Sequence, residues 1–209
     1  TVTLFRVPFP NNYEIPLMNL ILAVKLMDFS EYDRVIAFKF PAFYAVHSKK
    51  VLWFFHQFRQ VYELFDKEYG LKSDDIGLSL KEIIKHNDTK EIGNAHIVYT
   101  NAHEVTNRLK KYNDLASVIL PPPLKEWEKY NYKEYGNFIY YPSRITNLKR
   151  QHLAVEAMKY VKSDVKLVID GVCSESDYLE KIYYIIKKYK LEDKIIMENR
   201  WVTDEEKID

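Results

Sequence analysis

Glycine and cysteine are scarce in this sequence, and their scarcity excludes several common ligand sites. The 209 residues contain five glycines, none in a Gly-x-Gly pattern, so neither a P-loop nor the glycine-rich dinucleotide fingerprint is present. The only cysteine, Cys173, excludes an intramolecular disulfide and a cysteine-rich zinc site. A chain with one cysteine suits a reducing compartment, and secretion is not expected.

An excess of charge of one sign is also absent. Lys and Arg total 31 and Asp and Glu 30, which gives a formal net charge of +1. We therefore expect no nucleic-acid partner, and any anion site must be local. We expect no signal peptide, and the longest apolar run, residues 15–24, is too short to cross a bilayer. We expect that run to form a buried helix.

Metal and hydrolase motifs are missing as well. Carboxylates of the Asp-x-Asp type do not occur, and His86, His96 and His103 lack the spacing of a metal site. No Gly-x-Ser-x-Gly elbow is present. The sequence predicts no metal and no cofactor, and it disfavours hydrolase chemistry.

What the sequence does contain is an alternation of strand-like and helix-like segments. Hydrophobic residues make up 47% of the chain, which is enough for a core. Such an alternation predicts an α/β fold with parallel sheets. The expected strands are residues 2–7, 34–38, 50–55, 96–100, 117–120, 137–141, 165–171 and 194–200.

Helices are expected between these strands, and capping patterns predict where some of them begin. Residues 79–82, 101–104 and 203–206 each place Ser, Asn or Thr three positions before Glu, as at a helix N-terminus. Near the end of the chain, apolar spacing predicts one helix with four residues facing inward: Leu179, Ile182, Tyr183 and Ile186.

Three consecutive prolines, Pro121–Pro123, interrupt the alternation. Proline cannot donate ladder hydrogen bonds and favours a stiff, extended chain. A polar and aromatic stretch follows, and then the alternation restarts. We therefore predict a first Rossmann-like domain at residues 1–122, a linker at 123–136 and a second Rossmann-like domain at 137–209.

Cations follow the predicted strand 137–141, in the stretch YPSRITNLKRQHLAVEAM. Arg144, Lys149 and Arg150 precede a helix N-terminus, where the helix dipole makes cations locally unfavourable. In an open parallel sheet, ligands bind beyond the carboxyl ends of the strands, and a helix N-terminus favours phosphate. An anion is therefore expected there. The alternative is that these are solvated loop cations, which are common on surfaces.

His56 has the corresponding position in the first half, directly after the predicted strand 50–55. A histidine there can hydrogen-bond a sugar hydroxyl or stabilise developing charge, and it can equally be structural. Arg59, three residues later, is a weaker candidate because it can simply pair with Glu63 on one helical face.

These segments resemble a known family. FIYYPSRITNLKRQHLAVEAMKYVKSDVKLVIDG and LEDKIIMENRWVTDEEKI are similar to the donor-binding domain of the group 1, or family 4, retaining glycosyltransferases. KVLWFFHQFRQVYELFD and IVYTNAHEVTNRLKKYNDLASVILPPP are similar to the acceptor-side domain of that family. The resemblance implies the GT-B architecture, with two Rossmann-like parallel-sheet domains.

The resemblance also implies a reaction and its residues. The family moves a hexose from a nucleoside diphosphate sugar to a glycan or lipid-linked acceptor, with retention and here without a metal. Its Arg and Lys contacts to the diphosphate correspond to Arg144 and Lys149, whose charges would stabilise the leaving phosphate. Its first-domain histidine corresponds to His56, which we expect to be catalytic. Arg59 is kept as a substrate-binding candidate.

Two features of the family are missing. Residues 1–16 contain no glycine-rich loop, and the chain ends before the position of the family's Glu-x7-Glu motif. Both domains are therefore expected to be incomplete.

Other classes of function stay open. A GT-B-type epimerase or phosphorylase would share the architecture, and a non-catalytic module would bind a sugar nucleotide or a protein. The resemblance implies a cytoplasmic protein, with contact to the inner face of the membrane as an option because acceptors are often lipid-linked. The basic stretch 107–112 offers a small face for such contact, although a solvated helix surface is the simpler interpretation.

Overall fold

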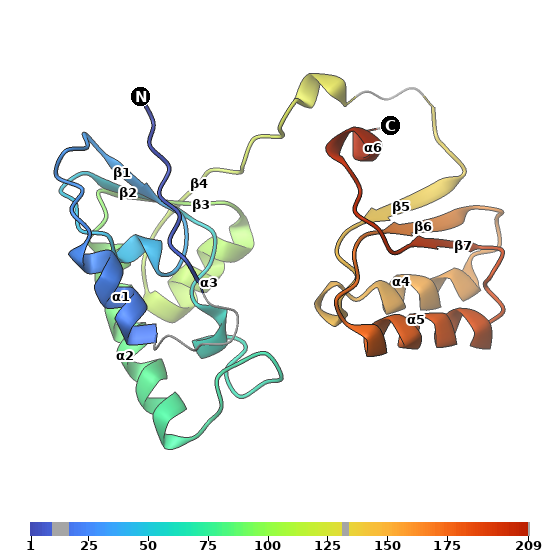
Figure 1. Ribbon diagram of the computed structural model, residues 1–209, viewed down its shortest axis with the longest axis horizontal. Coiled ribbons are helices and arrows are strands. Elements are labelled where there is room, and N and C mark those ends of the chain that lie inside the picture. Colours follow the sequence, from blue (N-terminus) through green and yellow to red (C-terminus); the bar gives the residue numbers. More distant parts are fainter. Residues whose placement is uncertain (10–16, 131–133, 209) are drawn as a thin grey trace. The chain divides into compact units, whose positions relative to one another are not determined.

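The computed structural model describes residues 1–9, 17–130 and 134–208. The chain divides into two compact units, Thr1–Pro123 and Leu124–Asp209 (Figure 1). Each unit has its own hydrophobic core. Each unit contains one parallel sheet with helices packed against it. The predicted α/β class with two parallel sheets is therefore confirmed.

The first unit is built on a four-stranded sheet, sheet A, with the strand order β1-β2-β3-β4. All neighbouring strands pair in parallel. β2 is buried along almost its whole length, as expected of an inner strand of a parallel sheet whose two faces are both covered. The strands are β1 (Val35–Ala37), β2 (Lys50–Phe54), β3 (Ile97–Thr100) and β4 (Val118–Ile119).

Three helices share one hydrophobic core with sheet A. The predicted buried helix at residues 15–24 corresponds to α1, and the aromatic side chains of Phe43, Tyr44 and Phe54 are completely buried in this core. The helices are α1 (Leu17–Leu26), α2 (Asp75–Gly93) and α3 (His103–Asn113), with single 3₁₀ turns η1 (Ala42–Tyr44) and η2 (Arg59–Val61).

Two boundary predictions for the first unit are wrong. Residues 2–7, expected as a strand, form no regular secondary structure. α2 begins four residues before the predicted cap at Ser79, because the Asp74 side chain accepts a hydrogen bond from the Gly77 N–H at 2.7 Å. A Cβ atom at Gly77 would lie 1.9 Å from the Lys72 carbonyl oxygen, so this first turn requires glycine.

The second unit is built on a three-stranded sheet, sheet B, with the order β5-β6-β7. In Figure 1, α4 and α5 lie on the same face of this sheet. The elements are β5 (Phe138–Pro142), β6 (Lys166–Asp170), β7 (Ile195–Glu198), α4 (Gln151–Ala157), α5 (Ser176–Lys188) and α6 (Asp204–Ile208), with 3₁₀ turns η3 (Trp127–Lys129), η4 (Asn147–Lys149) and η5 (Met158–Tyr160). Across the described ranges, no helix has the length and apolar character needed to cross a membrane.

The remaining capping predictions have opposite outcomes. Thr203 and Glu206 form the expected capping box of α6, since the Thr203 N–H donates to Glu206 Oε2 at 2.8 Å and the Glu206 N–H to Thr203 Oγ1 at 3.2 Å. The prediction for Asn101 is wrong, because Ala102 is the N-cap residue of α3 and no side chain caps that helix.

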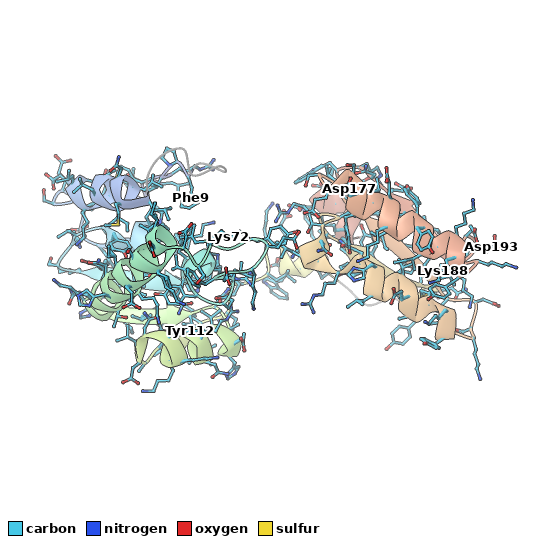
Figure 2. All side chains as sticks on the ribbon, turned by 90° about the horizontal axis from the view of Figure 1, so that it is seen from below. Phe9, Lys72, Tyr112, Asp177, Lys188 and Asp193 are labelled. Carbon is cyan, nitrogen blue, oxygen red and sulfur yellow. The ribbon has the colours of Figure 1, made fainter. Side chains whose placement is uncertain are left out.

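The charges of α5 follow its dipole, with Asp177 in the first turn and Lys188 in the last (Figure 2). Its inward face differs from the prediction at one residue: Tyr183 is 50% exposed. The buried stripe is instead formed by Tyr178, Ile182, Ile185 and Ile186.

A buried carboxylate ties three segments of the first unit together. Asp88 of α2 is completely buried and accepts hydrogen bonds from the hydroxyls of Tyr44 at 2.5 Å and Tyr62 at 2.8 Å. Burial raises the pKa of Asp88 to about 7, although the two tyrosine bonds act in the opposite direction. Burial and the Asp88 charge raise the pKa of both tyrosines, so their hydroxyls stay protonated donors.

The raised pKa of Asp88 predicts that the first unit loses stability as the pH rises. The folded unit holds a proton that the unfolded chain has already released, so this stabilisation is complete below about pH 4 and is lost as the pH passes about 7. We expect the free energy of unfolding to fall by up to about 1.4 kcal/mol per pH unit in this window. The substitution Asp88→Asn should flatten the slope.

Urea unfolding at several pH values measures this slope, with Trp53 fluorescence as the probe of the first unit. Trp127 and Trp201, both exposed, are replaced by Phe in the background so that only Trp53 reports. Glu82→Gln, an exposed position on the same helix, serves as the control and should keep the wild-type slope. An unchanged slope in Asp88→Asn would contradict the prediction.

Candidate functional site

The four predicted site residues lie beyond the carboxyl ends of two strands, one in each unit. Arg144 and Lys149 belong to the segment between β5 and α4, residues 143–150, which we call the cation loop. His56 and Arg59 follow β2 in the first unit. The structure thus brings the members of each pair into one loop region of their own unit.

The cations of the cation loop are exposed and have no carboxylate partner. Arg144, Lys149 and Arg150 make no side-chain hydrogen bond or ion pair with any residue that the structure describes. Arg200, which follows β7, is different, because it pairs with Glu198 at 2.5 Å and Glu206 at 2.6 Å. Positive charge is therefore left uncompensated at the end of β5, where it can attract an anion.

The start of the cation loop is bound to the last residue of β6 and to the chain that follows it. The Ser143 N–H donates to the Asp170 carbonyl at 2.9 Å and the Ile145 N–H to the Val172 carbonyl at 3.1 Å. Gly171, at φ 155°, makes this approach possible, because a Cβ atom there would lie 1.9 Å from the Ser143 carbonyl oxygen. The main chain around Arg144 is thereby fixed on one side.

The backbone donors near the N-terminus of α4 are partly used within the unit. The His152 N–H donates to the Tyr178 hydroxyl at 3.1 Å, and the Asn147 N–H donates to Glu175 Oε2 at 3.0 Å. These two N–H groups are therefore not free to bind a phosphate. Recognition of an anion would depend mainly on the side chains of Arg144 and Lys149.

One acidic side chain at this edge of sheet B is buried. Asp170 is buried, and its Oδ1 atom has no hydrogen-bond partner within the described part of the chain. The pKa of Tyr140 is raised, first by the burial of its own hydroxyl and second by the negative charge of Asp170. Among residues 1–9, 17–130 and 134–208, no group of three or more His, Cys, Asp or Glu could hold a metal ion.

His56 is half-buried and is oriented by its own backbone neighbour. Its Nδ1 atom lies 2.6 Å from the Gln57 carbonyl oxygen. A carbonyl only accepts, so Nδ1 carries the proton in the neutral ring and Nε2 presents a lone pair. Burial lowers the pKa of His56, Lys39 and Arg59 lower it further, and the Gln57 bond and Glu63 oppose this. The imidazole is therefore neutral near pH 7 and its Nε2 can accept a proton.

Gln57, which sequence analysis did not identify, fixes the position of His56. Its side chain is 1% exposed and donates to Asn113 Oδ1 at 3.1 Å, and Asn113 in turn donates to Thr89 Oγ1 at 2.8 Å. The chain after β2 is thus tied to α2 and α3. The available signal was a glutamine within the otherwise aromatic stretch FFHQF.

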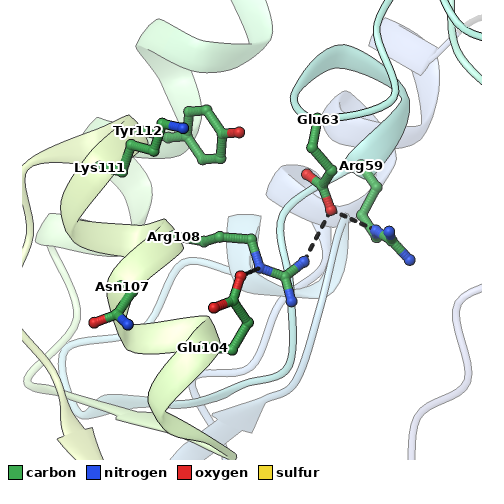
Figure 3. Close-up of a pocket in the computed structure, with 7 residues that line it drawn as sticks. All are labelled: Arg59, Glu63, Glu104, Asn107, Arg108, Lys111 and Tyr112. Carbon is green, nitrogen blue, oxygen red and sulfur yellow. Dashed lines mark hydrogen bonds and ion pairs between the residues drawn. The ribbon is translucent and has the colours of Figure 1, made fainter.

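Arg59 pairs with Glu63, the alternative that the sequence left open beside a substrate-binding role. Arg59 Nε donates to Glu63 Oε1 at 2.5 Å, and Arg108 of α3 donates to the same oxygen at 2.9 Å (Figure 3). Burial alone would raise the pKa of Glu63, but its hydrogen bonds and the two guanidinium groups hold it below its usual value. These residues border a cavity of about 460 Å³ between η2 and α3.

The basic stretch 107–112 carries less free charge than its sequence suggests. Arg108 is paired with Glu63, and Lys110 lies 2.5 Å from Asp114. Lys111 lies over the ring of Tyr112, 5.3 Å from its centroid. These pairings favour a solvated helix surface over a membrane-binding face.

Comparisons with known proteins concern both units. Residues 125–206 match the sequence model of the family described as "Glycosyl transferases group 1", and this segment contains Arg144 and Lys149. No curated protein sequence matches the chain significantly.

Two solved structures align with this chain, and the first of them resembles its fold. The crystal structure of Anabaena Alr3699/HepE in complex with UDP has a TM-score of 0.52 at 10% identity, over 87% of this chain and 50% of that chain. The structure of Anabaena Alr3699/HepE in complex with UDP and glucose has a TM-score of 0.36 at 9% identity, over 79% and 69%. In the first of these alignments, the chain spans about half the length of that protein.

The environment of His56 predicts how its pKa responds to its neighbours. We expect its titration midpoint, measured by NMR, to lie below the ordinary value of 6.5. Lys39→Met should raise the midpoint because it removes a nearby positive charge, and Glu63→Gln should lower it because it removes a negative one. Lys49→Met, next to the opposite end of β2, is the control. Midpoints that do not move in the first two variants would refute this electrostatic account.

Proposed function

We propose that this protein is a metal-independent glycosyltransferase that moves a hexose from a nucleoside diphosphate sugar to a glycan or lipid-linked acceptor, with retention at the anomeric carbon. The observation that carries the proposal is the uncompensated pair Arg144 and Lys149 at the end of β5, inside the segment that matches the group 1 glycosyl transferases. In this proposal the second unit binds the donor and the first unit faces the acceptor, in the cytoplasm or at the inner face of the membrane.

The cation loop suits a diphosphate leaving group. When a glycosyl–phosphate bond breaks, negative charge grows on the departing phosphate, so fixed cations stabilise the transition state more than the ground state. Arginine offers bidentate contacts to phosphate and lysine a compact charge. Because neither Arg144 nor Lys149 has a carboxylate partner in the described residues, no ion pair has to break when the ligand binds.

His56 and Arg59 are assigned to the acceptor side. The lone pair of His56 Nε2 can accept a hydrogen bond from a sugar hydroxyl and hold the proton that the acceptor releases. Arg59 is 42% exposed, and its Nε binds Glu63, which leaves its terminal nitrogens for a substrate oxygen. The UDP in the Alr3699/HepE crystal structure supports the extension of nucleoside diphosphate binding to this chain.

Loss of either cation should weaken binding of nucleoside diphosphates. Calorimetry of the 209-residue chain with UDP and with GDP should give affinities that fall about 10- to 100-fold in Arg144→Ala and in Lys149→Ala, since each change removes a charge-assisted contact. Lys187→Ala, an exposed cation on α5, is the matched control and should bind as the wild type does.

The outcomes separate the candidate classes of function. Absence of binding by the wild-type chain would overturn the donor site and favour an interaction module. Conversion of a sugar nucleotide without an acceptor would identify an epimerase. Transfer to an acceptor with the anomeric configuration kept, and with activity strongly reduced by Arg144→Ala, supports the retaining transferase.

A further inference from the structure

The first residue of α4, Gln151, is a buried glutamine whose side chain binds the main chain of the cation loop. The Gln151 side chain is completely buried, and its Nε2 group donates to the Arg144 carbonyl at 2.8 Å and to Ser143 Oγ at 3.0 Å. Its Oε1 accepts a longer bond from the Tyr178 hydroxyl at 3.4 Å. Both amide protons and the amide oxygen of Gln151 are thus used.

The surroundings of Gln151 make this polar contact specific. Ile145 and Val155, on either side in the sequence, are completely buried in the hydrophobic core of the second unit. A buried amide in such a place is costly unless its hydrogen bonds are made. Without the amide, the Arg144 carbonyl would keep, among the described residues, only a weak contact with the Ser143 hydroxyl at 3.4 Å.

Gln151 acts on the side of the loop that β6 does not reach. The N–H groups of Ser143 and Ile145 point to the end of β6 and to the chain after it, whereas the carbonyl of Arg144 points to Gln151. The peptide unit that joins Arg144 to Ile145 is therefore held at its carbonyl and at its N–H, whereas the Arg144 side chain is exposed.

We propose that Gln151 is a positioning residue for the donor site: by fixing the main chain of Arg144, it places the guanidinium group where the diphosphate binds. This inference rests on the proposed function. Positioning of a charged group matters because a displacement of about 1 Å can cost about a hundredfold in rate.

A double-mutant cycle on the full 209-residue chain tests the proposal. Gln151→Met keeps the size of the side chain and removes both donors, and it should weaken binding of UDP or GDP about tenfold. In a chain that already carries Arg144→Ala, the same change should weaken binding less than about twofold, because the residue that it positions is gone. A merely structural role would give equal effects in both backgrounds.

Two further variants keep the result interpretable if Gln151→Met folds poorly. Val155→Ala removes a buried side chain one turn along α4 that has no bond to the cation loop, and it should lower stability without changing affinity. Ser143→Ala removes one acceptor of Gln151 at a half-buried surface position and should weaken binding about twofold to threefold.

The possible results are distinct. Wild-type affinity in Gln151→Met and Ser143→Ala, beside weakened binding in Arg144→Ala, would overturn the role of Gln151 and leave the donor site standing. Weakened binding in Val155→Ala to the same extent would also overturn it, because loss of packing alone would then explain the effect. No nucleotide binding by the wild type would overturn the donor site and with it this role.

Discussion

Parallel strand pairing is the constraint on which both candidate sites depend. In sheet B it brings the ends of β5, β6 and β7 to one edge, so that the segments leaving β5 and β6 run side by side and N–H groups of the first donate to carbonyls of the second. The glycine at position 171 permits this close contact. The conformation of the cation loop is consequently held by hydrogen bonds of its main chain, and the side chains of its cations take no part in those bonds.

In the first unit, hydrogen bonds between buried polar groups fix the position of the candidate site residue His56. His56 is hydrogen-bonded to the Gln57 carbonyl, and the Gln57 side chain donates to Asn113. Asn113 in turn donates to the Tyr62 hydroxyl, which donates to Asp88. This chain of bonds joins the segment after β2 to α2 and α3. Buried networks of this kind specify one arrangement because each unsatisfied member would be costly. The orientation of the imidazole is therefore a property of the core of the unit.

The sequence was informative where apolar pattern decides the structure. The buried strand β2 stands out as a continuous apolar run, and the capping box at Thr203 is local in sequence. Residues 2–7 have an equally strand-like pattern and form no strand, because pairing with a neighbour is a long-range property that letters do not encode. The same limit applies to the site. Arg144 and Lys149 were visible as cations, whereas their lack of partners and the contacts of Gln151 and Gln57 arise only when distant segments meet.

Gln151 donates a hydrogen bond to the main-chain carbonyl of residue 144 and makes none to its side chain. Every amino acid has that carbonyl, so the frame of the loop does not depend on which side chain stands there. The chemistry offered at this place can therefore change by a single substitution while the architecture stays the same. Such a separation lets natural variation retune what the loop recognises without rebuilding the domain that presents it.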